Sequence, residues 1–241
     1  MEEWFENWFD TEYYHILYKN RNEAEAELFI QNLVNHLQLN KQQKILDLAC
    51  GKGRHALFLN KLGFDVLGLD LSTQSIDFAK KQQNETLKFD VHDMRKVYAE
   101  NSFDLVVNLF TSFGYFTNKQ DNRKVIESIY TQLKSNGKLI IDFMNSKKMI
   151  NQIIPTETKE IDGISFHITK KYEDDFILKQ IQFLDQNKSY LFQEKVQALQ
   201  LNDFIVLTQE LFSLKNIFGN YKLEKYDENS SDRLILEFQK K

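Results

Sequence analysis

The sequence is poor in residues that cross-link or interrupt a chain, with one cysteine and one proline in 241 residues. A single cysteine, Cys50, excludes an internal disulfide and is compatible with a reducing cytosol. One proline and the lack of any low-complexity tract argue against a flexible linker. No apolar run approaches the roughly 20 residues of a membrane span, and Met1-Glu2-Glu3-Trp4 is unlike a signal peptide. We therefore expect a cytoplasmic protein without membrane segments.

An excess of basic residues is also missing. The net charge is −4 and the isoelectric point is about 5.8, so no global basic field marks a nucleic-acid surface. The chain is long enough for one large α/β domain or for such a domain with an insertion. We expect a small-molecule partner rather than nucleic acid.

A glycine loop follows the first apolar strand pattern, Ile45 to Leu48, and leads into a helical pattern. The fragment Gly51-x-Gly53-x-x-Ala56 fits a dinucleotide fingerprint, with Asp70 roughly 20 residues further on. Asp47 favours another cofactor, because a carboxylate does not suit a pyrophosphate. S-adenosylmethionine has no phosphate and carries a cationic amino group and a sulfonium, which Asp47 could serve directly or by orienting the loop amides.

Strand and helix patterns alternate along the middle of the chain, which predicts a parallel, doubly wound, Rossmann-like sheet. The strands are expected at residues 45–48, 64–69, 86–91, 103–109 and 138–143, and the helices at 23–39, after the glycine loop, at 72–83 and at 119–133. Gly63 is expected to end the second helix and Ser72 to cap the third.

The pattern changes after Pro155, where apolar residues alternate with polar ones in period 2. Turn signals at residues 162–163, 173–175 and 186–188 predict an antiparallel β-meander over 156–199. A helix over 202–211 and strands over 214–218 and 233–238 follow, the strands completing the main sheet as a hairpin. We expect three parts: a helical segment 1–40, a cofactor-binding domain 41–155 with 200–241, and the inserted meander 156–199. The meander's apolar face must be buried, over the substrate side or in a homodimer.

Aromatic residues crowd the N-terminal segment, namely Trp4, Phe5, Trp8, Phe9, Tyr13, Tyr14 and Tyr18. Two interpretations remain open: a helix packed on the flank of the domain, or a lid over the cofactor. Tyr14 and Tyr18 are one helical turn apart, and Arg21 follows three residues later. In the lid interpretation, Arg21 binds the methionine carboxylate of the cofactor.

Polar residues occur at the ends of the predicted strands, where ligands bind in open α/β sheets. These residues are Asp47, Asp70, Asp93 and Asn108. Asp70 suits the two ribose hydroxyls, and Asp93 with the Met94 amide suits an adenine. The alternative for Asp70 is a helix-capping acid.

These motifs, in this order, resemble those of class I S-adenosylmethionine-dependent methyltransferases, in the small-molecule group with a methyltransferase-25 or type-11 domain. The matching segments are Asp47-Leu-Ala-Cys-Gly-Lys-Gly-Arg-His55, Gly68-Leu-Asp70-Leu-Ser72, His92-Asp-Met-Arg95, residues 103–116 and the strand 136–143. Ala49 replaces the first glycine of the family pattern. The resemblance implies that the loop holds the methionine part, the second-strand acid the ribose and the third-strand Asp the adenine. The cofactor-binding residues predicted in all are Asp47, Ala49, Gly51, Gly53, Arg54, Asp70, Leu71, Asp93, Met94, Asn108, Tyr14, Tyr18 and Arg21.

The chemistry predicted is methyl transfer to an N or O of a small molecule, in which alignment supplies much of the acceleration. We assign no general base, because the candidates lack a partner legible in the sequence; they are His15, His55, His167, Tyr14, Tyr18 and Tyr115. Phe113 and Tyr115 could contact the sulfonium or pack in the core. No metal is expected. The alternatives are an NAD(P)-dependent oxidoreductase and a non-catalytic S-adenosylmethionine-binding module.

Overall fold

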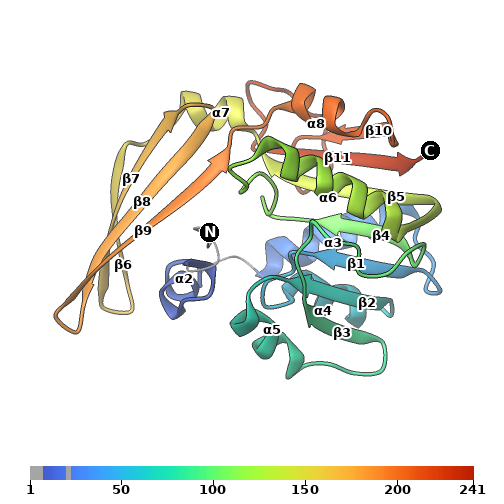
Figure 1. Cartoon of the computed structure of the whole chain (residues 1–241), viewed down its shortest axis with the longest axis horizontal. Coiled ribbons are helices and arrows are strands. Elements are labelled where there is room, and N and C mark those ends of the chain that lie inside the picture. Colours follow the sequence, from blue (N-terminus) through green and yellow to red (C-terminus); the bar gives the residue numbers. More distant parts are fainter. Residues whose placement is uncertain (1–7, 20–22) are drawn as a thin grey trace.

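The computed structural model describes residues 8–19 and 23–241, which form a seven-stranded sheet and a separate four-stranded sheet (Figure 1). The strand order of the larger, main sheet is β10-β11-β5-β4-β1-β2-β3. Its strands are β1 (Lys44–Leu48), β2 (Asp65–Asp70), β3 (Leu87–Val91), β4 (Phe103–Asn108), β5 (Leu133–Met144), β10 (Phe212–Phe218) and β11 (Arg233–Lys240). The first five run parallel, and β11 pairs antiparallel with both β5 and β10. The predicted Rossmann-like sheet with a C-terminal antiparallel hairpin is confirmed.

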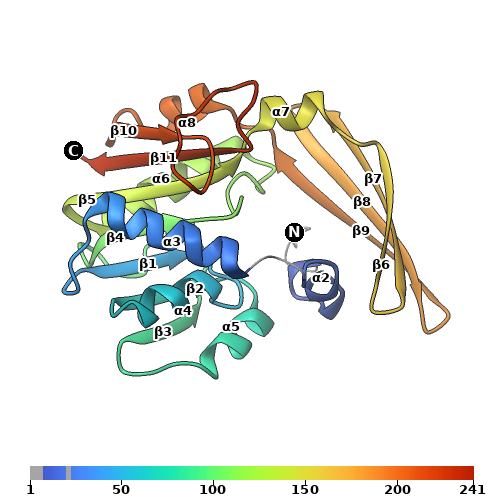
Figure 2. The same cartoon turned by 180° about the vertical axis from the view of Figure 1, so that it is seen from behind.

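Helices cover both faces of the main sheet (Figures 1 and 2). On one face, α3 (Glu23–Leu37), α4 (Arg54–Lys61) and α5 (Thr73–Lys80) pack over one apolar cluster. On the other face, α6 (Lys119–Gln132) and α8 (Leu201–Thr208) pack over a second cluster. Leu105 of β4 belongs to the first cluster and its neighbour Val106 to the second. A strand buried on both faces needs apolar residues at successive positions, which explains its continuous apolar run.

Several predicted helices extend too far at their C-terminal ends. The first was predicted to reach Leu39 but ends at Leu37, since Gln38 has a left-handed φ of 52° and the Leu39 N–H bonds to the Val34 carbonyl. Such a turn satisfies the last carbonyls and stops the helix. Ser72 caps α5 as predicted, its hydroxyl accepting the Ser75 N–H.

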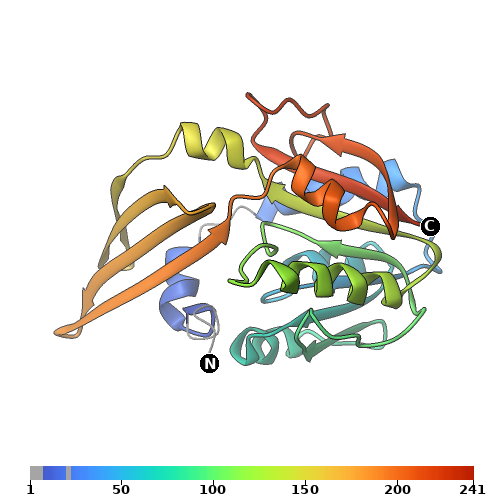
Figure 3. The same cartoon turned by 45° about the horizontal axis from the view of Figure 1, so that its top comes forward.

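The predicted meander is confirmed as the four-stranded sheet, made of β6 (Thr156–Ile161), β7 (Ile164–Glu173), β8 (Phe176–Asp185) and β9 (Lys188–Gln197). Within residues 156–197, each hairpin turns on two residues that both have positive φ: Asp162 with Gly163, Asp174 with Asp175, and Gln186 with Asn187. This is the type I′ geometry, which matches the twist of antiparallel strands. Short α7 (Ser146–Asn151) connects β5 to the meander (Figure 3).

The N-terminal segment, residues 8–19 with α2 (Glu12–Leu17), lies between the meander and the main sheet (Figures 1 and 2). Trp8 and Leu17 form one apolar cluster with Phe166, Ile181 and Phe183 of the meander. The meander therefore buries its apolar face within its own chain, and burial alone does not require a homodimer. The dimer stays a prediction. Trp4 and Phe5 lie outside the described residues.

Among the helices that the structure describes, none combines the length and the apolar character needed to cross a membrane.

Candidate functional site

A first cleft, with a cavity volume of about 120 Å³, opens beyond the carboxyl ends of β1, β2 and β4. Six of the predicted cofactor residues of the core domain contribute to its wall. The residues that line the cleft are Phe9, Tyr14, Ala49, Gly51, Asp70, Leu71, Ser72, Ser75, His92, Asp93, Met94, Arg95, Ser112, Tyr115 and Phe116.

The glycine loop forms the floor of this cleft in an unusual backbone conformation. Ala49, Gly51 and Gly53 have φ values of 63°, 56° and 82°. The loop therefore alternates into the left-handed region, which glycine adopts without steric cost and alanine does not. Ala49 takes this conformation at the position where the family pattern has glycine. Gly53 is the N-cap of α4.

Asp47 lies beneath the loop, 1% exposed, and its Oδ2 accepts the Ala56 N–H at 3.1 Å. Burial raises the pKa of this carboxyl to about 7, against the opposing effects of the Ala56 N–H and Arg54. Asp47 is not among the described residues that line this cleft or the wider cleft beside it. The Asp47 carboxyl thus bonds to an amide of α4 rather than of the loop, and its role toward the cofactor stays a prediction.

Asp70 ends β2 and faces the first cleft. Its two carboxylate oxygens accept the Gly51 N–H at 2.7 Å and the Ser72 N–H at 2.8 Å. Burial raises the pKa of Asp70, while these N–H bonds act in the opposite direction. Asp70 thus joins the glycine loop to the start of α5, and each oxygen retains a second lone pair for a ligand hydroxyl. The ribose role stays a prediction.

Asp93 lines the same cleft beside Met94, but it has a partner that the sequence did not reveal. The Arg95 guanidinium donates two hydrogen bonds to the Asp93 carboxylate, from Nε to Oδ1 at 3.0 Å and from Nη2 to Oδ2 at 2.8 Å. Burial acts to raise the pKa of Asp93, but the Arg95 contacts outweigh it and hold the pKa below its usual value. Arg95 also reaches Asp121 of α6. The adenine role of Asp93 and Met94 stays a prediction.

The other two predicted core residues differ in position. Leu71 lines the first cleft and is 36% exposed. Asn108 is 0% exposed and donates from its amide to the Leu48 carbonyl at 2.9 Å, so it ties the end of β4 to the end of β1. Within the described chain, Asn108 lies below the cleft walls rather than in them. Its cofactor role is therefore still untested.

A second, wider cleft of about 640 Å³ adjoins the first on the other side of the glycine loop. Tyr14, Ala49, Gly51, Ser75 and Ser112 line both. Predicted residues Arg54 and Tyr18 line only the second. Arg21 lies outside the described residues. The two clefts meet at the glycine loop.

The N-terminal segment is held over the first cleft from two sides. The Asp10 carboxylate accepts from the Ser72 hydroxyl at 2.7 Å and from the Gln74 N–H at 2.9 Å. On the meander, Glu194 accepts from the Trp8 indole N–H at 2.8 Å and from the Tyr18 hydroxyl at 2.7 Å. The sequence showed aromatic density here but gave no indication of these two carboxylates as partners.

The candidate bases are scattered. His15 and His55 line the second cleft, Tyr115 lines the first, and His167 is exposed on the meander, where its ring contacts Thr158. Phe113 is 0% exposed in the core cluster under α6 and α8. Burial raises the pKa of the Cys50 thiol well above its usual value. No base is assigned.

Residues 45–137 match the family profile described as a methyltransferase domain. Over these residues the chain carries a methyltransferase domain of the class I S-adenosylmethionine-dependent kind. This match covers the glycine loop, Asp70 and the Asp93 loop, the segments that form the first cleft. The family match gives no support to the oxidoreductase alternative.

Two relatives illustrate the family resemblance of this methyltransferase. It is 29% identical over 178 residues to glycine/sarcosine N-methyltransferase of Aphanothece halophytica, covering 71% of this chain and 66% of that protein. A crystal structure of an S-adenosylmethionine-dependent methyltransferase from Clostridium acetobutylicum shares its fold, with a TM-score of 0.79 and 18% identity over 94% of this chain and 95% of the other.

A third similar structure is SAM-bound CalS10 of Micromonospora echinaspora, an amino pentose methyltransferase. It has a TM-score of 0.74 and 13% identity over 96% of this methyltransferase and 98% of CalS10. These structural matches cover the meander as well as the main sheet. The match spans 24% to 66% of the lengths of the curated relatives.

The two loop glycines should respond differently to substitution by alanine. In Gly53→Ala, a Cβ would come 2.6 Å from the Phe89 ring at a φ of 82°. We expect this change to lower the free energy of unfolding by about 2–4 kcal/mol, from left-handed strain plus overpacking. Gly51→Ala is the matched control, because a Cβ there meets no described atom within 4 Å. It should cost about 1 kcal/mol. Equal losses in urea unfolding would contradict this prediction.

Proposed function

We propose that this protein transfers a methyl group from S-adenosylmethionine to a nitrogen or oxygen of a small molecule in the cytoplasm. The observation that carries the proposal is the first cleft, where Asp70 stands beside the glycine loop at the end of β2. A carboxylate in this place suits ribose hydroxyls, and Asp47 beneath the loop disfavours a pyrophosphate.

The residues of the first cleft fit the cofactor. Its apolar walls, formed by Phe9, Met94, Tyr115 and Phe116, suit an adenine and a thioether chain. Arg95 is neutralised by Asp93, so Asp70 leaves the wall acidic, which suits a cationic ligand. When bound, S-adenosylmethionine supplies a methyl group on a sulfonium, which passes to the acceptor lone pair as the carbon–sulfur bond breaks.

The chain's own contribution is binding, alignment and exclusion of water. The glycine loop separates the two clefts, so ligands in each would meet at Ala49 and Gly51. The N-terminal segment covers this meeting point through Tyr14, which lines both clefts. Holding two reactants in line supplies a large part of such a rate enhancement.

Nitrogen is the first acceptor atom to test. One relative is named for N-methylation of glycine and sarcosine, another for phosphoethanolamine, and CalS10 for an amino pentose. We therefore propose an amine-bearing small molecule, with a hydroxyl acceptor as the alternative.

Incubation with methyl-labelled S-adenosylmethionine and a metabolite extract tests the proposed activity. We expect label in a small molecule, and none when Asp70→Ala replaces the wild type. Cofactor binding without transfer to any acceptor in a broad amine and alcohol panel would identify a non-catalytic module instead. Preferential binding of NAD(P) would contradict the proposal.

The lid interpretation of the N-terminal segment predicts an effect of Asp10→Ala. This change removes the acceptor of the Ser72 hydroxyl and the Gln74 N–H, which anchor the segment to the cofactor side. We expect three- to tenfold weaker binding of S-adenosylhomocysteine through faster dissociation, with the melting temperature nearly unchanged. The control is Glu12→Ala, an exposed acid two residues further along the chain. If Asp10→Ala lowers only the melting temperature, the segment is a flank helix.

A further inference from the structure

The post-β4 loop, residues 109–116, contributes to the walls of both clefts. Ser112 lines both of them, Phe110 lines the second, and Tyr115 and Phe116 line the first. The conformation of this loop therefore determines the shape of the place where the two clefts meet.

Two successive residues of the post-β4 loop have a backbone conformation that their side chains disfavour. Phe110 and Thr111 both have a left-handed φ of 63°. Neither is a glycine, and a β-branched residue such as threonine rarely occupies this region. Such a conformation persists only when the surrounding structure holds it in place. The groups that hold these two residues therefore control the shape of the loop.

Asp142 of β5 holds the backbone of both residues. Its carboxylate Oδ2 accepts the Phe110 N–H at 2.8 Å, and its main-chain carbonyl accepts the Thr111 N–H at 2.9 Å. The Asp142 side chain is 0% exposed, and the Tyr221 hydroxyl also donates to Oδ2 at 3.2 Å. A carboxylate buried so deeply needs a cationic partner in addition to these hydrogen bonds.

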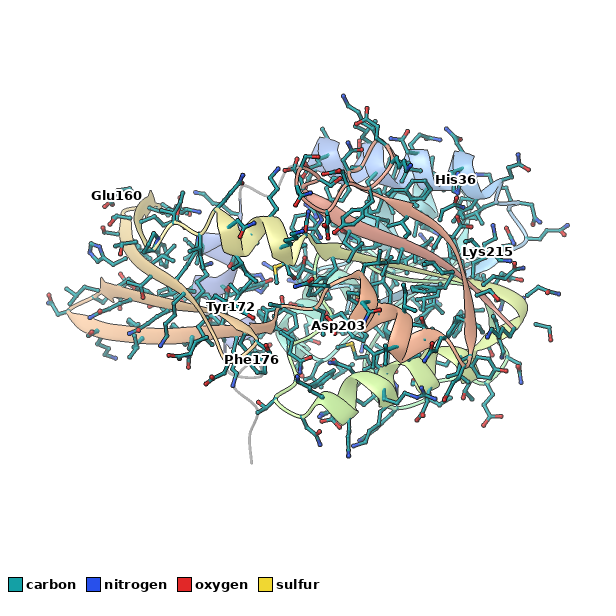
Figure 4. All side chains as sticks on the ribbon, turned by 90° about the horizontal axis from the view of Figure 1, so that it is seen from above. His36, Glu160, Tyr172, Phe176, Asp203 and Lys215 are labelled. Atoms are coloured by element: carbon teal, nitrogen blue, oxygen red, sulfur yellow. The ribbon has the colours of Figure 1, made fainter. Side chains whose placement is uncertain are left out.

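Arg233, at the start of β11, is that partner and contacts the loop at the same time. Its Nε donates to Asp142 Oδ1 at 2.7 Å, and its Nη2 donates to the Thr111 hydroxyl at 2.9 Å. The Arg233 side chain is 18% exposed, whereas Lys215 on the neighbouring strand β10 is exposed (Figure 4). A guanidinium makes both contacts because its donors are spread over a rigid fork, which an ammonium lacks.

The meander holds the other end of the post-β4 loop. The buried Gln197 of β9 donates from its backbone N–H to the Gly114 carbonyl and from its side-chain amide to the Phe116 carbonyl, both at 2.8 Å. Ser112 lies between this end and the residue that Arg233 holds. The part of the loop that lines both clefts is therefore tied on either side.

From these contacts we propose that Arg233 is a positioning residue of the methyl-transfer site, whose hydrogen bond to Thr111 keeps the post-β4 loop in the shape that binds the cofactor. The inference rests on the proposed methyltransferase function. Arg233 is not among the described residues that line either cleft, so it acts through the loop. Without its bond to Thr111, other loop conformations compete, and binding weakens by the fraction of molecules that keep the binding shape.

Calorimetric titration with S-adenosylhomocysteine tests this role in three single variants. Arg233→Lys keeps a cation for Asp142 but loses the fork, and we expect binding to weaken about fivefold or more as the left-handed strain is released. Thr111→Val removes the hydroxyl acceptor without changing any charge and should weaken binding similarly. Thr111→Ser keeps the hydroxyl and should bind as the wild type does.

A glycine in place of Thr111 separates positioning from general stability. Glycine adopts a φ of 63° without steric cost. Thr111→Gly should therefore bind S-adenosylhomocysteine within about threefold of the wild type. Adding Arg233→Lys to Thr111→Gly should weaken binding by less than about twofold, because the strain that Arg233 opposes is gone.

The matched control is Arg123→Lys, the same change in a guanidinium that donates to Glu127 of α6 and to Glu210. It should leave the affinity for S-adenosylhomocysteine unchanged.

The inference is wrong if either Arg233→Lys or Thr111→Val binds S-adenosylhomocysteine as the wild type does. A lower melting temperature with unchanged affinity would identify the contacts of Arg233 as merely structural. An equal loss from Arg233→Lys with and without Thr111→Gly would also contradict the inference. If Arg233→Lys does not fold, Thr111→Val alone decides. Failure of the wild type to bind S-adenosylhomocysteine would instead contradict the proposed function.

Discussion

Asp47→Asn is expected to be more stable than the wild type at pH 8, by about 1–3 kcal/mol. Asp47 is 1% exposed, and burial raises its pKa from 3.8 to about 7. The folded state therefore holds a proton that the unfolded state has lost between about pH 4 and 7. Its free energy of unfolding falls as the pH rises through this window, by up to about 4 kcal/mol at 1.36 kcal/mol per pKa unit. An asparagine keeps an acceptor for the Ala56 N–H and carries no charge, but its buried amide group offsets part of the gain.

Urea unfolding between pH 5 and 8 measures this effect. The Asp47→Asn curve should be flatter than that of the wild type, whereas Asp77→Asn, at an exposed site on α5, should run parallel to it. A pH dependence unchanged in Asp47→Asn would contradict the raised pKa. Titration with S-adenosylhomocysteine at pH 8 separates the two predicted roles of Asp47. If Asp47 contacts the cofactor amino group, Asp47→Asn should lower the affinity at least tenfold. If Asp47 only supports the loop, the affinity should fall less than threefold.

Asp70→Ala should weaken S-adenosylhomocysteine binding by about 1.5–3 kcal/mol, the scale of hydrogen bonds to a charged group. The change removes the proposed ribose partner and leaves the Gly51 and Ser72 N–H groups without their acceptor. Calorimetry should show the loss. Asp90→Ala, on the neighbouring strand and partly exposed, is the matched control.

A ligand that lacks one of the two ribose hydroxyls separates the two contributions of Asp70. If Asp70 binds the ribose, its removal should cost less for the 2′-deoxy form of S-adenosylhomocysteine than for the parent. An equal loss for both ligands would assign the effect to the loop, and unchanged affinity for the parent would refute the ribose role.

The parts of this fold that were predictable depend on residues close together in sequence. Gly51 and Gly53 have left-handed φ values within a short strand–loop–helix segment. The conformation of such a segment depends on residues that are neighbours in the sequence. The hairpin turns at Asp162-Gly163 and Gln186-Asn187 are likewise recognisable from their residue types. Ends of helices were less predictable, because Gln38 is an unusual residue for a left-handed stop.

The candidate site was predictable only in outline. Asp70 lies in the first cleft as the strand-end argument requires, but Asn108, chosen by the same argument, points under the loop to the Leu48 carbonyl. The end of a strand fixes the position of a residue's backbone, whereas packing decides the direction of its side chain. Arg54 was assigned to the glycine loop as a whole, and only the folded chain shows that it lines the second cleft.

The position of the N-terminal segment also has consequences for the order of synthesis. Trp8 is synthesised before its partner Glu194, which lies 186 positions later. At roughly 5–20 residues per second, that interval is on the order of 10–40 s. Meanwhile, the strands from β1 to β5 can already pair, and Asp10 can already reach Ser72 and Gln74. During translation, the N-terminal segment therefore has its contacts on α5 before its contacts on the meander exist.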